Sequence, residues 1–149
     1  MTQLHGTNFE LVGDFMEAMD QEIQIYPVFP EEHIQKLRVD LIEEELDELQ
    51  LGIDNQDIVE VADALTDLLY VIYGAGQAFG IDLDECFQEV HCSNMSKLGQ
   101  DGRVIKREDG KVLKPNTYFP PDIASVLAVW IKYVIAYYRC AVVGGGPVR

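Results

Sequence analysis

Hydrophobic residues recur at helical spacing through the first hundred residues. In the first such segment Phe9, Val12 and Met16 share one helical face, which Thr7 or Asn8 can cap. Three further segments show the same period. The predicted helices span residues 8–20, 30–51, 54 to about 76, and 82 to about 98, with Gly52 expected to end the second. The pattern therefore predicts an all-α fold with four helices.

The chain after these helices follows two other patterns. Residues 100–122 are irregular and basic, with Asp109-Gly110 placed to turn a short hairpin. Residues 123–143 are almost entirely apolar, but Lys132 near their middle disfavours a membrane span. We expect a C-terminal apolar helix packed on the protein or on a partner subunit, although the β-branched content leaves a strand open. The expected organisation is a domain over 1–122 and an extension over 123–149.

Carboxylates occupy positions of the second predicted helix where its period calls for apolar residues. The apolar face is set by Ile34, Leu37 and Leu41. Continuing that face by steps of four and three gives Glu45 and Glu48, and Glu44 lies at its edge. Glu43 and Asp47 point away, as ordinary surface acids do. At least two carboxylates are therefore expected on the inward face.

An acidic stripe also runs along the third predicted helix. Glu60, Asp63 and Asp67 are spaced by three and four residues. An apolar face lies beside this stripe, made by Ile58, Val61, Leu65, Leu68 and Ile72. A helix with apolar residues on both flanks of an acidic stripe is expected to be enclosed. These acids should then face protein or a lined cavity.

The two acidic sets are predicted to meet. Glu45/Glu48 and Glu60/Asp63 are equally distant from position 54, the middle of the predicted connection. A short connection makes the helices antiparallel, so four carboxylates should converge at one level. They would repel strongly unless they bound protons or cations, and all-oxygen ligation suits Mg²⁺ or Mn²⁺. The alternative is a solvated acidic surface.

Charge is also concentrated along the sequence. Of the 26 acidic residues, 15 lie between positions 39 and 96, a stretch without Lys or Arg. The net charge of −15 excludes a general nucleic-acid binder. The three cysteines fit neither a disulfide framework nor a CxxC zinc pattern. Together with an N-terminus unlike a secretory signal, they predict a cytoplasmic protein.

Polar groups also extend the apolar stripe of the fourth predicted helix. That stripe, Leu83, Phe87 and Val90, continues to Asn94 and Lys97. Beside a carboxylate site these two are expected to contact an anionic ligand. Cations next to basic groups favour a polyphosphate substrate, and a metal-free carboxylate could take a proton from the attacking water. No GxxxxGK[ST] loop is present, which excludes a P-loop enzyme.

The ordered motifs resemble a known family. Glu44-Glu45-Leu46-Asp47-Glu48 followed by Glu60-Val61-Ala62-Asp63 forms an EExxE…ExxD signature. The stretches RVDLIEEELDEL, EVADALTDLLYVIYG, SNMSK and DGKVLKPNTYFPPD extend the likeness over about residues 8–123. Together they resemble the all-α nucleoside triphosphate pyrophosphohydrolases, the MazG-like and phosphoribosyl-ATP-pyrophosphohydrolase-like group.

The resemblance implies a four-helix MazG-like bundle that assembles as a homodimer or homotetramer. It implies Mg²⁺-dependent hydrolysis between the α- and β-phosphates of a nucleotide, giving a nucleoside monophosphate and pyrophosphate. Carried over by motif, the metal ligands would be Glu45, Glu48, Glu60 and Asp63. Glu44 would be a further ligand or would activate the water. The candidate catalytic residues are Glu44 and Glu45.

The same resemblance implies where substrate binds. Asn94 and Lys97 would contact phosphate or sugar, and Lys111, Lys114 and Tyr118 are candidates for the phosphate tail. Asp67, one turn beyond the ExxD motif, fits the resemblance less well; it could be an outer neighbour of the metal or an additional ligand.

Three functional hypotheses remain open at this point. The first is hydrolysis of dUTP, dCTP or a noncanonical nucleoside triphosphate. The second is phosphoribosyl-ATP pyrophosphohydrolase of histidine synthesis, which performs the same chemistry on another substrate. The third is a non-catalytic helical dimerisation module that binds divalent ions for stability.

Overall fold

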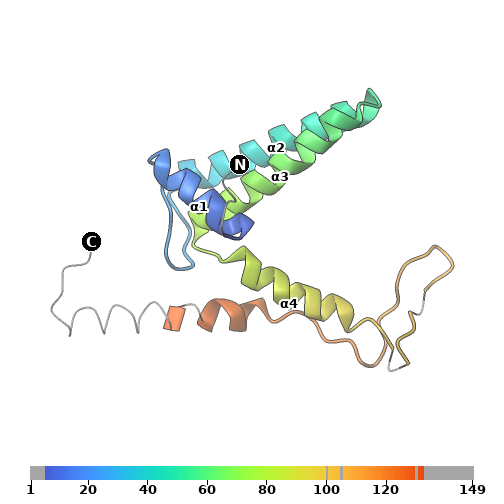
Figure 1. Ribbon diagram of the computed structural model, residues 1–149. Coiled ribbons are helices and arrows are strands. Elements are labelled where there is room, and N and C mark those ends of the chain that lie inside the picture. The colour runs from blue at the N-terminus through green and yellow to red at the C-terminus, as the bar shows by residue number, and fades with distance from the viewer. Residues whose placement is uncertain (1–5, 100, 105, 130, 133–149) are drawn as a thin grey trace. The chain divides into compact units, whose positions relative to one another are not determined.

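The described part of the chain is helical. The computed structural model describes residues 6–99, 101–104, 106–129 and 131–132. Its helices are α1 (Asn8–Ala18), α2 (Glu32–Asp54), α3 (Ile58–Phe79) and α4 (Leu83–Met95), as Figure 1 shows. Residues 123–129 and 131–132 are also helical. Across these described ranges, β structure is limited to one isolated bridge between Lys106 and Val112. The predicted all-α class is confirmed.

The chain divides into two compact units. The first unit, Met1–Leu83, holds α1, α2 and α3, and the second, Asp84–Arg149, holds nearly all of α4 and the basic hairpin. Within the first unit, α3 contacts both α1 and α2. Helix α3 is therefore the central element of that unit.

Helix α1 is capped and packed as its sequence predicts. Thr7 and Glu10 form a capping box, each side chain accepting a hydrogen bond from the other's backbone N–H. Val12 and Met16 are buried. The ring of Phe15 meets that of Tyr70 edge-on, with centroids 5.5 Å apart. This aromatic contact helps to hold α1 against α3.

Helices α2 and α3 form an antiparallel hairpin whose turn differs from the prediction. Gly52 does not end α2 but lies inside it, buried, and the helix continues to Asp54. A Cβ at Gly52 would lie 3.1 Å from the Val61 nitrogen and 3.3 Å from the Glu60 Cβ. Because glycine has no side chain, the two helices can approach closely at Gly52. The residue does not serve as a helix cap.

Helix α3 begins and ends later in the chain than predicted. Asp57 caps its start by accepting hydrogen bonds from the Val59 and Glu60 nitrogens at 3.0 and 3.3 Å. The helix runs on past Gly76 and ends at Gly80, which has a φ of 65°. A Cβ at Gly80 would lie 2.1 Å from the Tyr26 carbonyl oxygen, so this position requires glycine.

Small residues, not the predicted bulky ones, form the buried side of α3. The buried residues are Ala64, Gly74, Gly76, Gln77 and Ala78. On the predicted apolar face, Ile58, Leu65 and Ile72 are 76%, 48% and 40% exposed. That part of the prediction is wrong for this chain, because small side chains permit the closest helix approach and leave the larger ones outside.

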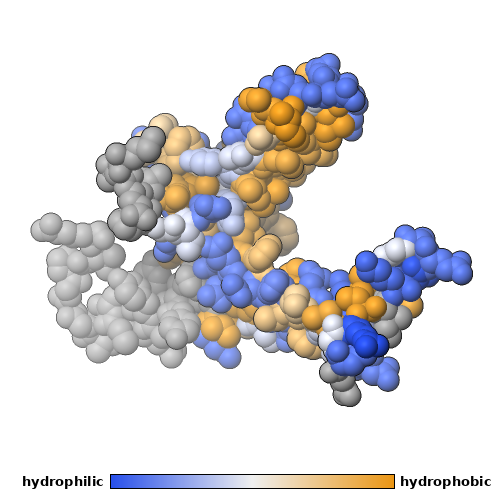
Figure 2. Space-filling view, turned by 45° about the vertical axis from the view of Figure 1, so that its right-hand side comes forward, coloured by the Kyte–Doolittle hydropathy of each residue, from blue (hydrophilic) through white to orange (hydrophobic). Residues whose placement is uncertain are grey.

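Two further apolar positions depart from the prediction in the same way. Leu37 on α2 and Phe87 on α4 were expected to be buried, and both are exposed. Figure 2 shows hydrophobic residues gathered on the visible surface of the α2–α3 hairpin. A face of this kind is typical of an interaction surface.

The hairpin predicted at Asp109-Gly110 is present in reduced form. Lys106 bridges Val112, the Arg107 nitrogen donates to the Lys111 oxygen at 2.8 Å, and Gly110 has a φ of 83°. Of the predicted apolar helix over 123–143, the described residues are helical, and residues 130 and 133–143 lie outside the described part. No helix in the described ranges is long and apolar enough to cross a membrane.

The close approach at Gly52 leads to a stability prediction. Gly52→Ala should destabilise the chain by about 1–3 kcal/mol, because the added methyl group meets backbone at Val61. Urea denaturation would measure the change. Asp47→Ala, on the exposed side of the same helix, is the control. If Gly52→Ala were as stable as this control or more so, helix propensity would outweigh the contact and the close approach would be refuted.

Candidate functional site

The Gly52 contact sets the register of the acidic residues. Gly52 lies against Glu60, so moving two turns along each antiparallel helix brings Glu45 opposite Asp67. Seven residues change the direction of a side chain by only about 20°. Glu45 therefore faces α3 as Gly52 does, and Asp67 faces α2 as Glu60 does.

This register corrects the predicted level of the carboxylates. Glu48 is nearly level with Asp63, as expected, but Glu60 lies about 6 Å nearer the turn, one helical turn beyond Glu48. The prediction of four carboxylates at one level is wrong for Glu60. The error arose because the turn is centred near Gln56, two residues later than position 54.

The acidic side chains differ in exposure. Glu45 and Asp67 are half-buried, whereas Glu44, Glu48, Glu60 and Asp63 are exposed in this chain. The expectation that the acidic stripe of α3 is enclosed is thus met only at Asp67. Glu43 and Asp47 are exposed, as predicted.

Glu45 has the most perturbed environment among these acids. Burial raises the pKa of Glu45 above its ordinary value, and the charges of Glu48, Asp67, Glu44 and Asp63 raise it further. Its Oε2 atom is buried and has no hydrogen-bond partner among the described residues. A buried carboxylate oxygen without a partner, surrounded by negative charge, is suited to a cation.

The donor chemistry around Glu45 fits a hard divalent cation, since the charged groups that act on Glu45 are all carboxylates. Within the described ranges, no three Asp, Glu, His or Cys side chains are arranged around one point as ligands of a single metal ion. Magnesium is commonly held by one or two carboxylates together with water and substrate phosphates. A pair of carboxylates therefore suffices for such a site.

The second unit brings together four of the five predicted substrate-binding residues. The Lys97 ammonium donates to the Asn94 Oδ1 at 2.6 Å. The Lys114 ammonium lies 4.1 Å from the centroid of the Tyr118 ring. A hydrogen bond with Lys114 lowers the pKa of the Tyr118 phenol, and the charge of Lys97 contributes to the same shift. These four residues form a basic cluster with donors for an anion.

Residues that the sequence analysis did not select hold this cluster in place. Ser93 donates to the Phe119 oxygen at 2.9 Å, and Ser96 accepts from the Phe119 nitrogen at 3.1 Å. Thr117 donates to the oxygens of Ser96 and Leu98. These bonds fix the loop before and after Tyr118 to the C-terminal end of α4. The SNMSK motif contained the signal, because both its serines make these contacts.

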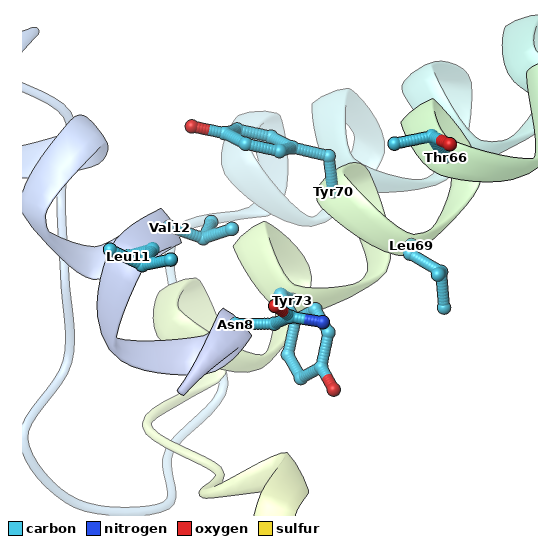
Figure 3. A pocket seen from close by; sticks show the side chains of 7 residues that line it. All are labelled: Asn8, Leu11, Val12, Thr66, Leu69, Tyr70 and Tyr73. Carbon is cyan, nitrogen blue, oxygen red and sulfur yellow. The ribbon is translucent and has the colours of Figure 1, made fainter. Parts of the chain in front are cut away.

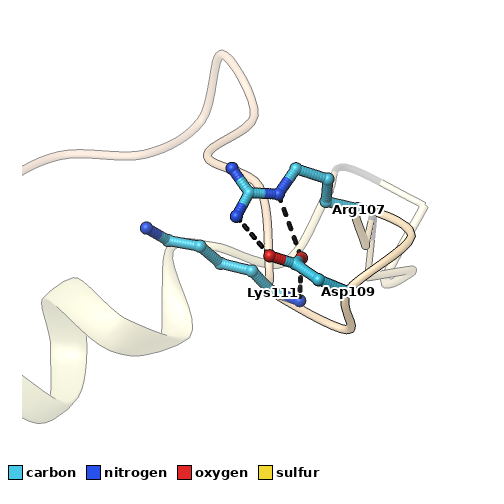
Figure 4. A network of polar contacts seen from close by, with 3 residues as sticks. All are labelled: Arg107, Asp109 and Lys111. Carbon is cyan, nitrogen blue, oxygen red and sulfur yellow. Dashed lines mark hydrogen bonds and ion pairs between the residues drawn. The ribbon is translucent and has the colours of Figure 1, made fainter.

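Lys111, the fifth predicted residue, lies in the hairpin turn. Its backbone nitrogen donates to Asp109 at 3.1 Å, and Asp109 is paired with Arg107. These contacts lower the pKa of Asp109, with the Arg107 bond the larger cause. Figure 4 shows the Lys111 side chain extending away from that pair. Within the described residues, no interaction joins its ammonium group to the basic cluster.

A separate pocket lies between α1 and α3 (Figure 3). Its volume is about 140 Å³, and it is lined by Asn8, Leu11, Val12, Thr66, Leu69, Tyr70 and Tyr73. The lining is mainly apolar and contains no carboxylate. None of the acidic residues of the α2–α3 hairpin lines this pocket. The pocket is thus distinct from the acidic site.

Taken together, the first unit is a helical hairpin with carboxylates facing each other across it, a type of site that binds divalent cations. Comparison with known proteins gives the family. The model of the phosphoribosyl-ATP pyrophosphohydrolase family matches residues 12–94, so the chain belongs to that family. The matched region contains every acid of the EExxE…ExxD signature. The resemblance seen in the sequence is confirmed.

Two individual proteins are similar to this chain. The uncharacterized protein L479 of Acanthamoeba polyphaga mimivirus is 40% identical over 83 residues, which are 53% of this chain and 33% of L479. The chain thus spans about a third of that relative's length. A crystal structure from Exiguobacterium sp. 255-15, titled "a putative NTP pyrophosphohydrolase", is 22% identical with a TM-score of 0.47, covering 91% of this chain and 99% of that one.

The environment of Glu45 predicts a pH-dependent effect. Glu45→Gln should raise the melting temperature of the metal-free chain, and more at about pH 7 than at about pH 4. The pKa of Glu45 is raised above 4.5 in the folded state. Above 4.5 the folded state therefore binds more protons than the unfolded state, and the wild-type chain loses stability as the pH rises.

Thermal melting in a chelator at both pH values would measure this effect. Glu43→Gln removes an exposed acid of the same helix and is the control. It should change the melting temperature little at either pH. An equal effect of Glu45→Gln at the two pH values would contradict the proposed environment.

Proposed function

We propose that the chain is a divalent-cation-dependent pyrophosphohydrolase that cleaves nucleoside triphosphates between the α- and β-phosphates. The observation that carries this proposal is the half-buried Glu45, whose unpartnered Oε2 lies in a field of carboxylates from both arms of the hairpin. Membership of the family supports the same class of chemistry. The products would be a nucleoside monophosphate and pyrophosphate.

In the proposed mechanism, Glu45, Glu48 and Asp63 would supply carboxylates for binding divalent cations, and Glu60 would be a ligand nearer the turn. The bound ion, Mg²⁺ or Mn²⁺, would supply charge neutralisation and polarise the phosphoryl group. Glu44 is exposed at the edge of the acidic site and would take a proton from the attacking water. The Lys97 and Lys114 ammonium groups would bind phosphate oxygens, with Asn94 and the Tyr118 hydroxyl as additional donors.

The test is a pyrophosphate-release assay on the full chain. The panel contains dUTP, dCTP, the other canonical triphosphates, noncanonical triphosphates and phosphoribosyl-ATP, each with Mg²⁺ and with Mn²⁺. The family's description names phosphoribosyl-ATP, which is therefore the second candidate substrate. Release from phosphoribosyl-ATP alone would select that candidate. Stabilisation by Mg²⁺ without any turnover would select a non-catalytic ion-binding module and refute the proposal.

Two substitutions test the role of the facing acids. Glu48→Gln and Asp63→Asn should each lower pyrophosphate release at least about 100-fold, because a cation ligand contributes several kcal/mol to catalysis. Circular dichroism should show an intact helical fold. Glu43→Gln and Asp47→Asn, exposed acids on the same hairpin, are matched controls and should keep the wild-type rate. A wild-type rate in Glu48→Gln or Asp63→Asn would rule out the proposed site.

We also propose that the active form is a homodimer or homotetramer, with a second copy covering the exposed apolar face of the hairpin. Several large residues there are more than half exposed: Leu46, Leu51, Ile53, Ile58, Val59 and Leu69. Large exposed apolar patches are typical of subunit interfaces. Sedimentation should show a dimer or tetramer, and Ile58→Glu with Leu51→Glu should shift it to the monomer. A monomeric wild-type chain would refute this proposal.

A further inference from the structure

Asp67 lies directly opposite Glu45 across the α2–α3 contact. The contact on the turn side is the close approach of Gly52 to Glu60. Two helical turns away from that contact, the equivalent positions on the two helices are those of Glu45 and Asp67. Both residues are half-buried, whereas the neighbouring acid Asp63 is exposed. The central pair is therefore the enclosed pair.

Another contact lies two helical turns from the pair, on the side away from the α2–α3 turn. A Cβ at Gly74 would lie 3.3 Å from the Arg38 Nη1 atom. Positions 38 and 74 lie seven residues from Glu45 and Asp67, on the side away from the turn. Positions 52 and 60 lie seven residues from the same pair, on the side of the turn. The Arg38 guanidinium thus reaches α3 at the level that the same register gives. At the outer levels one partner is glycine, and at the central level both partners are carboxylates.

Two carboxylates that face each other at a helix contact repel unless something positive lies between them. No ion pair joins Glu45 or Asp67 to a Lys, Arg or His in the part of the chain that the structure describes. Arg38 is buried on the same face of α2, but its Nη2 atom donates to the Gln21 side chain at 3.1 Å. The pair thus lacks a compensating side chain.

A separate observation points to a ligand at this place. The Glu45 Oε2 atom is buried, and no hydrogen-bond donor of the described residues reaches it. A buried oxygen of a charged group without a donor is costly. A cation between the two helices would satisfy it.

We propose that Asp67 is a ligand of a divalent cation, Mg²⁺ or Mn²⁺, which it shares with Glu45 across the helix contact. This inference rests on the proposed function for the role of the ion in hydrolysis, but ion binding itself can be measured without substrate. The proposal assigns a site residue outside the EExxE…ExxD signature. A two-carboxylate site of this kind completes its shell with water and substrate phosphates.

The experiment measures Mn²⁺ binding to the full chain by titration calorimetry, in the absence of nucleotide. Asp67→Asn should weaken Mn²⁺ binding at least tenfold, which corresponds to about 1.4 kcal/mol. Asp47→Asn, the same substitution on the exposed side of α2, is the matched control and should bind like the wild type. Equal affinity of the two variants would overturn the proposal.

A second variant and a second readout distinguish a ligand from a merely structural residue. Asp67→Glu keeps the carboxylate and should retain Mn²⁺ binding within a few-fold of the wild type. In a chelator, Asp67→Asn should melt at the wild-type temperature or higher because repulsion is removed, and added Mn²⁺ should raise its melting temperature less than it raises the wild type's. A full Mn²⁺-induced rise in Asp67→Asn would also overturn the proposal.

The outcome for ion binding is separable from the outcome for catalysis. If Asp67→Asn loses Mn²⁺ but the wild type releases pyrophosphate from no nucleotide, the ion site stands and the proposed function fails. If the wild type is active and Asp67→Asn binds Mn²⁺ normally, the proposed function stands and the assignment of Asp67 fails.

Discussion

The close packing of α2 against α3 is the constraint on which the rest of the first unit depends. It is possible because Gly52 lies against the backbone of α3, while Gly74 at the other end leaves room for the Arg38 guanidinium. Once the helices are this close, the side chains between those points must face each other. Those side chains are Glu45 and Asp67, so the packing that stabilises the hairpin also concentrates negative charge within it.

This arrangement accounts for an otherwise unfavourable distribution of residues. Burial and four neighbouring charges raise the pKa of Glu45, and its buried oxygen lacks a donor. Evolution of stability alone would replace such a group by an apolar one. Under the proposed function, a chain that keeps it gives up stability for cation binding, which is the usual relation between a strained site and its function.

The second unit contributes the opposite chemistry. The serines of α4 and the following turn hold the Tyr118 loop by hydrogen bonds to its backbone, and this places two lysines near one phenol ring. Repulsion between the lysines is reduced by the Asn94 oxygen and by the ring face. The acidic and basic groups thus lie on separate, locally ordered elements.

The sequence by itself determined the helical class and the four main helices, because a 3.6-residue period and capping residues act locally. It also selected Asn94, Lys97, Lys114 and Tyr118, which the structure brings together. Only the tertiary structure decided which acids are level with each other, because register depends on where the turn is centred and on which residues are small enough to touch. Gly52 served as a contact instead of a cap, and that difference moved Glu60 away from the central level and brought Asp67 opposite Glu45. The bulky residues of α3 lie outside for the same reason, since helix proximity is set by the smallest side chains and not by the most hydrophobic ones.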